Sequence, residues 1–276
     1  MHCCTTRCAP WPGTAVVDQA SAVSPPAHHV TGVSRLERWR RFAADRLDPK
    51  VYLGVHVTVS FVVCALAVWL FAALVDAVLE SDSIVKFDIV AAAWIHARVT
   101  PLGLRVFQLV TDIGSPIFVS VLVVAMVIWC WWRRERVLAV AVATICAGEA
   151  LLDRVLKSVI HRSRPEFGAQ FLHGRSFSFP SGHAFGSIVA YGLLAYLLIA
   201  FYRPAPKTRK WIHAGIAALI LAIGISRVYL GVHYPSDVIG GFAAGIAWLS
   251  ICLTGIRLAR EHSSRADAPS AVGAAG

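Results

Sequence analysis

Long apolar runs, separated by short polar and basic stretches, make up most of the chain after residue 50. A transmembrane helix needs about 20 predominantly apolar residues. The pattern predicts six such spans, at residues 51–79, 117–132, 137–156, 182–202, 211–230 and 236–256. The predicted fold class is therefore all-α, a polytopic membrane helix bundle with six transmembrane helices in one domain (51–256).

The connections between these runs differ in character. Residues 84–99 are long enough for a surface helix and too polar to span a membrane. Residues 111–116 combine Gly, Ser and Pro and predict a break before the second span. A long polar loop, residues 157–180, separates the third span from the fourth.

The two ends of the chain are polar. Residues 1–33 are rich in Pro, Ala, Ser and Val without periodicity, which predicts a disordered N-terminal tail with no cleavable signal peptide. Residues 34–50 alternate Arg with bulky apolar side chains, a pattern typical of an amphipathic helix on the cytoplasmic membrane surface. Residues 257–276 form a second polar tail.

The basic clusters indicate the orientation. Those at 35–50, 133–136, 203–210 and 257–265 all fall on one side of a six-span protein, and the positive-inside tendency makes that side cytoplasmic. Both termini are then cytoplasmic, and the loop 157–180 faces outward. That loop is itself basic, so a functional reason is expected for it.

Composition supports a membrane protein. Of 276 residues 57% are hydrophobic and 15% are charged, and the mean hydropathy is +0.63. The net charge of +10 could suggest nucleic acid, but the basic residues flank apolar runs, which fits lipid headgroups better. We therefore expect a lipid bilayer and no nucleic acid as partner. The Ala-, Val- and Arg-rich composition favours a bacterial inner (plasma) membrane, and the oligomeric state stays open.

The seven cysteines predict no metal site. Four fall inside apolar runs, where a small buried hydrophobe is the usual role. The other three, Cys3, Cys4 and Cys8, lie near the N-terminus without a second pair of ligands.

One polar stretch lies where charge is least expected. Residues 226–237 separate the last two apolar runs and contain Arg227, His233 and Asp237. A charged residue at a span centre costs roughly 2.5–3.5 kcal/mol. Each of the three alone would fit a polar span end, but together they suggest a phosphate site. A helix that begins at Pro235 would let His233 and Asp237, four residues apart, meet.

Two upstream segments can supply the rest of such a site. Because successive spans reverse direction, Lys157, Arg164 and the start of the fourth span reach the same membrane surface as Arg227. A phosphoryl transition state spreads negative charge over three oxygens, which the three cations would bind. Ser181 and Gly182 open a helix whose first N–H groups favour an anion, and Gly182 lets the backbone approach closely.

Two histidines divide the chemistry. His233 has Asp237 to fix its tautomer and is the predicted nucleophile, with Asp237 as its orienter. His183 is then the acid and base that protonates the leaving alkoxide and activates water. Because no carboxylate cluster accompanies these segments, no metal and no cofactor are predicted.

These segments resemble the three-part signature of the type 2 phosphatidic acid phosphatase family. The matching motifs are Lys157-x6-Arg164-Pro165, Pro180-Ser181-Gly182-His183 and Ser226-Arg227-x5-His233-x3-Asp237. The resemblance covers roughly residues 84–256. It implies a metal-independent lipid phosphatase with six spans and an extracytoplasmic active site. The family also includes soluble vanadium haloperoxidases. The six predicted spans argue against a haloperoxidase activity for this chain.

The resemblance also assigns roles. In the family, the residues that match His233, His183 and Asp237 are catalytic. The residues that match the other fixed positions bind phosphate, namely Lys157, Arg164, Ser181, Gly182 and Arg227.

The sequence thus predicts an integral membrane phosphatase that acts on a lipid phosphate or pyrophosphate through a phosphohistidine. Candidate substrates are polyprenyl diphosphate, phosphatidylglycerol phosphate and phosphatidic acid, and a bacterial source would favour the first. A lipid phosphotransferase is an alternative, as is a non-catalytic lipid-binding or transport protein. The intact histidine pair argues against the last.

Several other polar residues receive no catalytic role. His161, Arg162, His173 and Arg175 match no fixed position and are interpreted as solvated or facing headgroups. Asp153 and Arg154 are expected to pair with each other. Glu149, inside an apolar run, has no predicted role.

Overall fold

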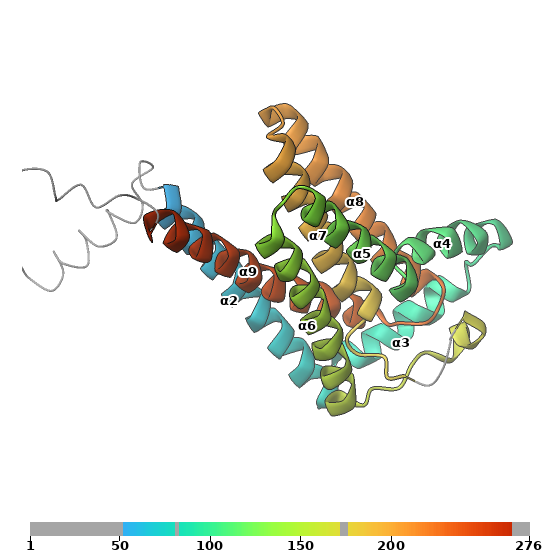
Figure 1. Cartoon of the computed structure of the whole chain (residues 1–276). Coiled ribbons are helices and arrows are strands. Elements are labelled where there is room, and N and C mark those ends of the chain that lie inside the picture. The colour runs from blue at the N-terminus through green and yellow to red at the C-terminus, as the bar shows by residue number, and fades with distance from the viewer. Residues whose placement is uncertain (1–51, 81–82, 172–175, 267–276) are drawn as a thin grey trace, which may run out of the picture. The chain divides into compact units, whose positions relative to one another are not determined.

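The computed structural model describes residues 52–80, 83–171 and 176–266, and in these ranges all regular elements are helices (Figure 1). They are α2 (Tyr52–Leu79), α3 (Ser83–His96), α4 (Pro101–Ile113), α5 (Pro116–Trp132), α6 (Arg136–Ile160), the short 3₁₀ helix η1 (Glu166–Phe171), α7 (Gly182–Tyr202), α8 (Pro206–Tyr229) and α9 (Pro235–Ala266). The all-helical prediction is confirmed for this part of the chain. The predictions for residues 1–33 and 34–50 lie outside the described residues. The predicted C-terminal polar tail is helical as far as Ala266.

Five helical stretches of the described chain are long and apolar enough to cross a membrane. They are Val57–Leu79, Pro101–Trp132, Gly182–Tyr202, Pro206–Tyr229 and Pro235–Ala259. α6 has the length, but Glu149, Asp153, Arg154 and Lys157 fall in its second half, and it is not among the five. The third predicted span, at 137–156, therefore stays a prediction, and with it the total of six.

Helix boundaries follow local chemistry. Ser115 accepts a hydrogen bond from the Phe118 amide (3.3 Å) and Pro116 stands at the first position of α5, so the predicted break at 111–116 is confirmed. α6 runs one turn further than predicted, which places Lys157 on a helix rather than in the loop. α8 begins at Pro206 instead of near residue 211, because proline is favoured in a first turn.

α7 is the central helix of the bundle and contacts α5, α6, α8 and α9. Its buried Phe185, Val189, Leu193 and Leu197 recur at helical spacing and pack in one cluster with buried residues of α5 and α6. α2 packs along α9 (Figure 1). This core fixes the start of α7, where the Ser-Gly-His motif lies.

Candidate active site

The predicted site residues meet around one cavity of about 1040 Å³. Its lining comes from α4, α5, α6, the loop after α6, the start of α7 and the end of α8. Six of the eight predicted site residues line it: Lys157, Arg164, Gly182, His183, Arg227 and His233. The other two, Ser181 and Asp237, are buried beside it and are not part of the lining.

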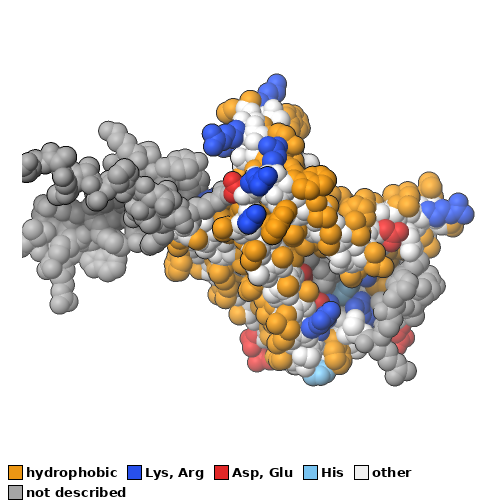
Figure 2. All heavy atoms as spheres, in the orientation of Figure 1, with side chains coloured by type: hydrophobic (Ala, Val, Ile, Leu, Met, Phe, Trp, Pro, Cys, Tyr) orange, Lys and Arg blue, Asp and Glu red, His pale blue; other side chains and the backbone are white. Residues whose placement is uncertain are grey.

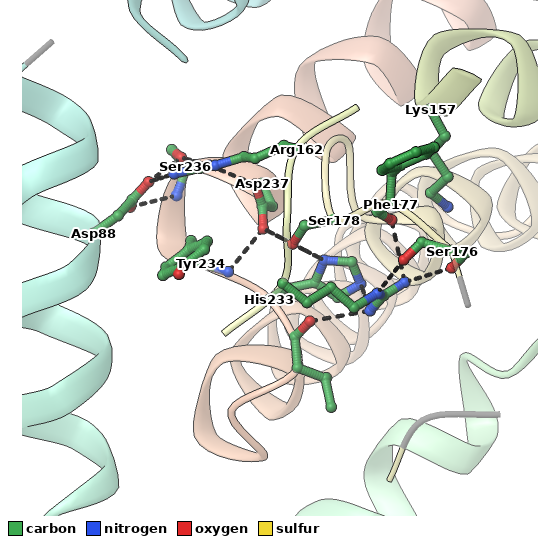
Figure 3. A network of polar contacts seen from close by, with 12 residues as sticks. Asp88, Lys157, Arg162, Ser176, Phe177, Ser178, His233, Tyr234, Ser236 and Asp237 are labelled. Carbon is green, nitrogen blue, oxygen red and sulfur yellow. Dashed lines mark hydrogen bonds and ion pairs between the residues drawn. The ribbon is translucent and has the colours of Figure 1, made fainter. Parts of the chain in front are cut away.

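His233 and Asp237 meet as their spacing predicted (Figure 3). The imidazole Nδ1 lies 3.5 Å from the Asp237 Oδ2, and His233 is buried. Asp237 Oδ2 also accepts hydrogen bonds from the Tyr234 amide (2.8 Å) and the Ser178 hydroxyl (2.5 Å). Ser178 Oγ is in turn 3.3 Å from His233 Nδ1. Sequence reasoning missed Ser178, because a serine in a loop gives no signal of a contact 59 residues away.

Arg164 determines the proton arrangement on His233. Its Nη1 lies 3.1 Å from His233 Nε2. A guanidinium can only donate hydrogen bonds, so Nε2 carries a lone pair and the ring proton belongs on Nδ1, toward Ser178 and Asp237. The cavity side of the ring is therefore the nucleophilic side.

The charge state of His233 follows from its surroundings. Burial lowers the pKa of His233 from 6.5 to about 3, against the opposing effect of Asp237 and together with the positive charge of Arg164 and Arg227. The imidazole is therefore neutral at neutral pH, as a nucleophile must be.

Backbone carbonyls hold the Arg164 guanidinium in place. Nε donates to Ser176 O (2.8 Å), Nη1 to Val232 O (3.0 Å) and Nη2 to Phe177 O (3.3 Å). Nη2 also donates to the Ser176 hydroxyl at 2.8 Å. Burial lowers the pKa of Arg164 below its ordinary value, and Asp237 and Asp153 oppose this. The loop before α7 thus supplies a fixed cation beside Nε2.

Lys157 reaches the site along α6. Its Nζ pairs with Asp153 Oδ2 at 2.6 Å, so the predicted pairing of Asp153 with Arg154 is wrong. A Cβ atom on Gly182 would lie 2.8 Å from Lys157 Nζ and 3.1 Å from Asp153 Oδ2. Glycine therefore leaves room for the Lys157 ammonium where α7 approaches the charged end of α6, and a larger residue would displace that ammonium.

Arg227 and the start of α7 form the rest of the polar end of the cavity. Arg227 Nη1 donates to the Thr111 hydroxyl at 2.8 Å, and its Nε is buried without a hydrogen-bond partner among the described residues. The Ser181 amide donates to Asp237 O at 2.9 Å, which ties the start of α7 to α9. The Ser181 hydroxyl likewise has no partner in the described part of the chain.

The interpretation of Arg162 as a solvated residue is wrong. Its side chain is 8% exposed and bridges two carboxylates that are 0% exposed. Nη1 donates to Asp237 Oδ1 at 2.5 Å and Nη2 to Asp88 Oδ2 at 2.7 Å (Figure 3). A sequence signal was available: Arg162 lies two residues from Arg164 in a loop that was expected to be functional.

The cavity has an apolar end away from the cations. α5 and α6 line it with residues at helical spacing: Ile117, Val123, Val124, Val127 and Ile128 from α5, and Ala143, Cys146, Ala147 and Ala150 from α6. We call this part the α5–α6 groove. Glu149 also lines the cavity, two turns before Lys157 on α6. Figure 2 shows a hollow in the molecular surface with basic side chains beside it.

The acidic and histidine side chains of the described residues are not arranged as metal ligands. In the part of the chain that the structure describes, no three His, Cys, Asp or Glu side chains gather closely enough to hold a metal ion. The charged groups that line the cavity are four cations, Arg154, Lys157, Arg164 and Arg227, and three carboxylates, Asp112, Glu149 and Asp153. Lys157, Arg164 and Arg227 accompany the two histidines, an arrangement that fits an anionic ligand.

The second half of the chain is similar to known proteins. The sequence model of the PAP2 superfamily matches residues 136–260. Phosphatidylglycerophosphatase B of Bacillus subtilis is 35% identical over 137 residues, which are 50% of this chain and 67% of that protein. The undecaprenyl-diphosphatase of Sulfolobus acidocaldarius is 43% identical over 74 residues, or 27% of this chain and 31% of that protein.

A solved structure agrees with these relatives. The crystal structure of a transmembrane PAP2 type phosphatidylglycerolphosphate phosphatase from Bacillus subtilis superposes with a TM-score of 0.66 and 27% sequence identity, and the match covers 71% of this chain and 96% of that one. The chain spans about two thirds of its first relative and about a third of the second. With apolar helices that match a transmembrane protein, this chain is an integral membrane protein, and it belongs to the PAP2 superfamily, as its three motifs had indicated.

Proposed function

We propose that the protein is an integral membrane phosphatase that hydrolyses a lipid phosphate or diphosphate. One observation carries this proposal: a single cavity joins a cluster of cations and two histidines to the apolar α5–α6 groove. A phosphate group fits the cationic end, and a lipid chain fits the groove. A phosphatase for small soluble substrates would have no use for the groove.

The proposed reaction has two steps. In the first, His233 Nε2 attacks the terminal phosphorus, the bond from phosphorus to the leaving oxygen breaks, and His183 gives its proton to that oxygen. The leaving group is the lipid alkoxide for a monophosphate and the lipid monophosphate for a diphosphate. In the second, His183 takes a proton from water, the water oxygen attacks phosphorus, and the bond from phosphorus to Nε2 breaks. Asp237 holds the Nδ1 proton and stabilises the imidazolium during both steps.

The phosphoryl oxygens are bound by fixed charge and by the start of α7. Lys157, Arg164 and Arg227 line the cavity and supply the positive charge that the transition state requires. The amides at Gly182 and His183 add N–H donors at the positive end of the helix dipole. The Ser181 hydroxyl, which has no partner among the described residues, is the eighth proposed site group. With three cations in place, the mechanism is proposed to need no metal ion.

The relatives give an order to the candidate substrates. The Bacillus subtilis relative is named for phosphatidylglycerophosphate and the Sulfolobus acidocaldarius relative for undecaprenyl diphosphate. We therefore rank phosphatidylglycerol phosphate and polyprenyl diphosphate above phosphatidic acid.

We further propose that α6 also crosses the membrane, as the third of six spans. The charged residues in its second half, Glu149, Asp153, Arg154 and Lys157, line the cavity. Ionisable residues within membrane spans are tolerated where they face a polar interior, so the charge of α6 does not argue against crossing. In a bacterial inner membrane, six spans would leave both termini cytoplasmic and the site at the extracytoplasmic face.

Phosphate release tests the proposal. The purified protein in detergent, with chelator, is given phosphatidylglycerol phosphate, polyprenyl diphosphate and phosphatidic acid in turn. We expect release from at least one lipid and none with His233→Ala. His213→Ala is the matched control, because His213 is exposed on α8 and lies outside the cavity. No release from any lipid would contradict the hydrolase, and transfer of phosphate to another lipid would indicate a phosphotransferase.

A further inference from the structure

We propose that Arg162 and Asp88 are positioning residues that hold Asp237 in the orientation the nucleophile needs, and that Arg162 has no part in binding phosphate. The inference rests on the proposed function. It adds α3, which contains none of the predicted site residues, to the parts of the protein that determine the reaction rate.

Arg162 fixes the orientation of the Asp237 carboxylate. It donates to Oδ1 at 2.5 Å, while Oδ2 accepts from Ser178 and the Tyr234 amide and faces His233 Nδ1. With Oδ1 bound to Arg162, rotation of the carboxylate would break the ion pair and two hydrogen bonds together. Oδ2 therefore keeps its orientation toward the imidazole ring of His233.

Arg162 also supplies the charge that makes two buried carboxylates possible. Asp88 and Asp237 are both fully buried, and both pair with its guanidinium. An unpaired buried carboxylate is strongly disfavoured and takes up a proton instead. A protonated Asp237 would stabilise the imidazolium poorly. The Arg162 guanidinium therefore favours the ionised form of Asp237, which the proposed reaction needs. The face of the guanidinium lies over the Tyr234 ring at 4.5 Å.

Asp88 anchors this arrangement from α3. Its Oδ1 accepts from the Ser236 amide at 3.1 Å, and its Oδ2 accepts from the Ser236 hydroxyl as well as from Arg162. Ser236 is the second residue of α9 and directly precedes Asp237. Asp88 and Ala92 are the buried residues of α3, whereas most of its other side chains are exposed. A single aspartate therefore ties α3 to the helix start that carries the orienter.

The position of Arg162 separates it from the phosphate ligands. It does not line the cavity, whereas Arg164, two residues later, does. The two arginines therefore form a matched pair for mutagenesis, with similar burial and the same loop but different partners.

The central experiment compares Arg162→Lys with Arg164→Lys on the best lipid substrate. Arg162→Lys keeps the charge but not the planar fork, so we expect kcat to fall about tenfold or more with KM within about twofold, because loss of the orienter costs far more than this in catalytic triads. Arg164→Lys is expected to raise KM as well as to lower kcat, because Arg164 lines the cavity and faces His233 Nε2. A raised KM with unchanged kcat in Arg162→Lys would overturn the inference and make Arg162 a phosphate ligand.

The pH profile separates positioning from structural support. Arg162→Met removes the cation, so Asp237 should take up a proton at higher pH, and the acid limb of the kcat profile should move to higher pH. Asp88→Asn keeps one acceptor oxygen for Ser236, loses the negative charge that pairs with Arg162, and should lower kcat with KM unchanged. Variants that melt at lower temperature but keep the wild-type kcat and acid limb would show a purely structural role.

Anion binding tests the inference without turnover. Vanadate bound to Nε2 depends on the orientation of His233, whereas inorganic phosphate depends mainly on the cavity cations. We expect Arg162→Lys to weaken vanadate binding about tenfold or more and to leave phosphate binding unchanged. An equal loss of affinity for vanadate and for phosphate in Arg162→Lys would overturn the proposed positioning role of Arg162. A wild-type protein that binds vanadate but hydrolyses no lipid would contradict only the proposed function.

Discussion

At the scale of single residues, the site depends on groups held in one ionisation state. His233 is buried, neutral and protonated on Nδ1, because Arg164 faces Nε2 and Asp237 faces Nδ1. A buried neutral imidazole gives a distinct pH dependence of stability.

We predict that stability falls as the pH is lowered from 6.5 toward 3. The pKa of His233 is about 3 in the folded protein and near 6.5 when exposed, so the unfolded chain binds more protons in that window. Above pH 6.5 the burial of neutral His233 costs no proton. Below pH 6.5 the free energy of unfolding falls by at most about 1.4 kcal/mol per pH unit, because the imidazole must lose a proton to be buried. Thermal unfolding in detergent between pH 4.5 and 7.5 measures this. An identical pH dependence for His233→Gln would contradict it.

Close approach at Gly182 gives a second prediction. In Gly182→Ala the new methyl would lie 2.8 Å from Lys157 Nζ, so the lysine must move away from the phosphate position. We expect kcat/KM to fall about tenfold or more, measured by phosphate release. Gly215→Ala on α8 is the control, because a Cβ there meets nothing within 4 Å, and it should keep full activity. Wild-type activity in Gly182→Ala would mean that Lys157 is not a phosphate ligand.

At the scale of helices, what could be predicted depended on whether the signal is local. α7 begins and ends as predicted, since the Ser-Gly start and the basic stretch after Tyr202 are local signals. The end of α6 was missed, because Lys157 continues a helix whose polar residues resemble a loop in sequence. The motif histidines were found from spacing, whereas Ser178 and Arg162 act through contacts 59 and 75 residues apart that spacing does not reveal.

The α5–α6 groove yields a prediction about chain length. Ala147 lines the groove and is exposed in it, so Ala147→Phe should obstruct a long lipid chain without touching the cations. We expect activity to fall about tenfold or more on long-chain lipid phosphate and to be unchanged on a short-chain, water-soluble one. Ala218→Phe, on the exposed face of α8, is the control. Equal losses on both substrates would contradict a chain-binding groove.

At the scale of the whole molecule, the open question is whether α6 crosses the membrane. Arg134 precedes this helix and Ser163 follows it, and both are exposed. In a cysteine-free background, a membrane-impermeant thiol reagent on intact cells should label Ser163→Cys and should label Arg134→Cys only after permeabilisation. Labelling of both from outside would contradict a sixth span.

The central claim is that His233 forms a covalent bond to the phosphoryl group. The most direct measurement is an alkaline quench during turnover of a lipid labelled in its phosphate, followed by peptide mapping. We predict label on His233 that chelator does not remove and that is absent from His233→Ala. Label on another residue, or full turnover by His233→Ala, would contradict it.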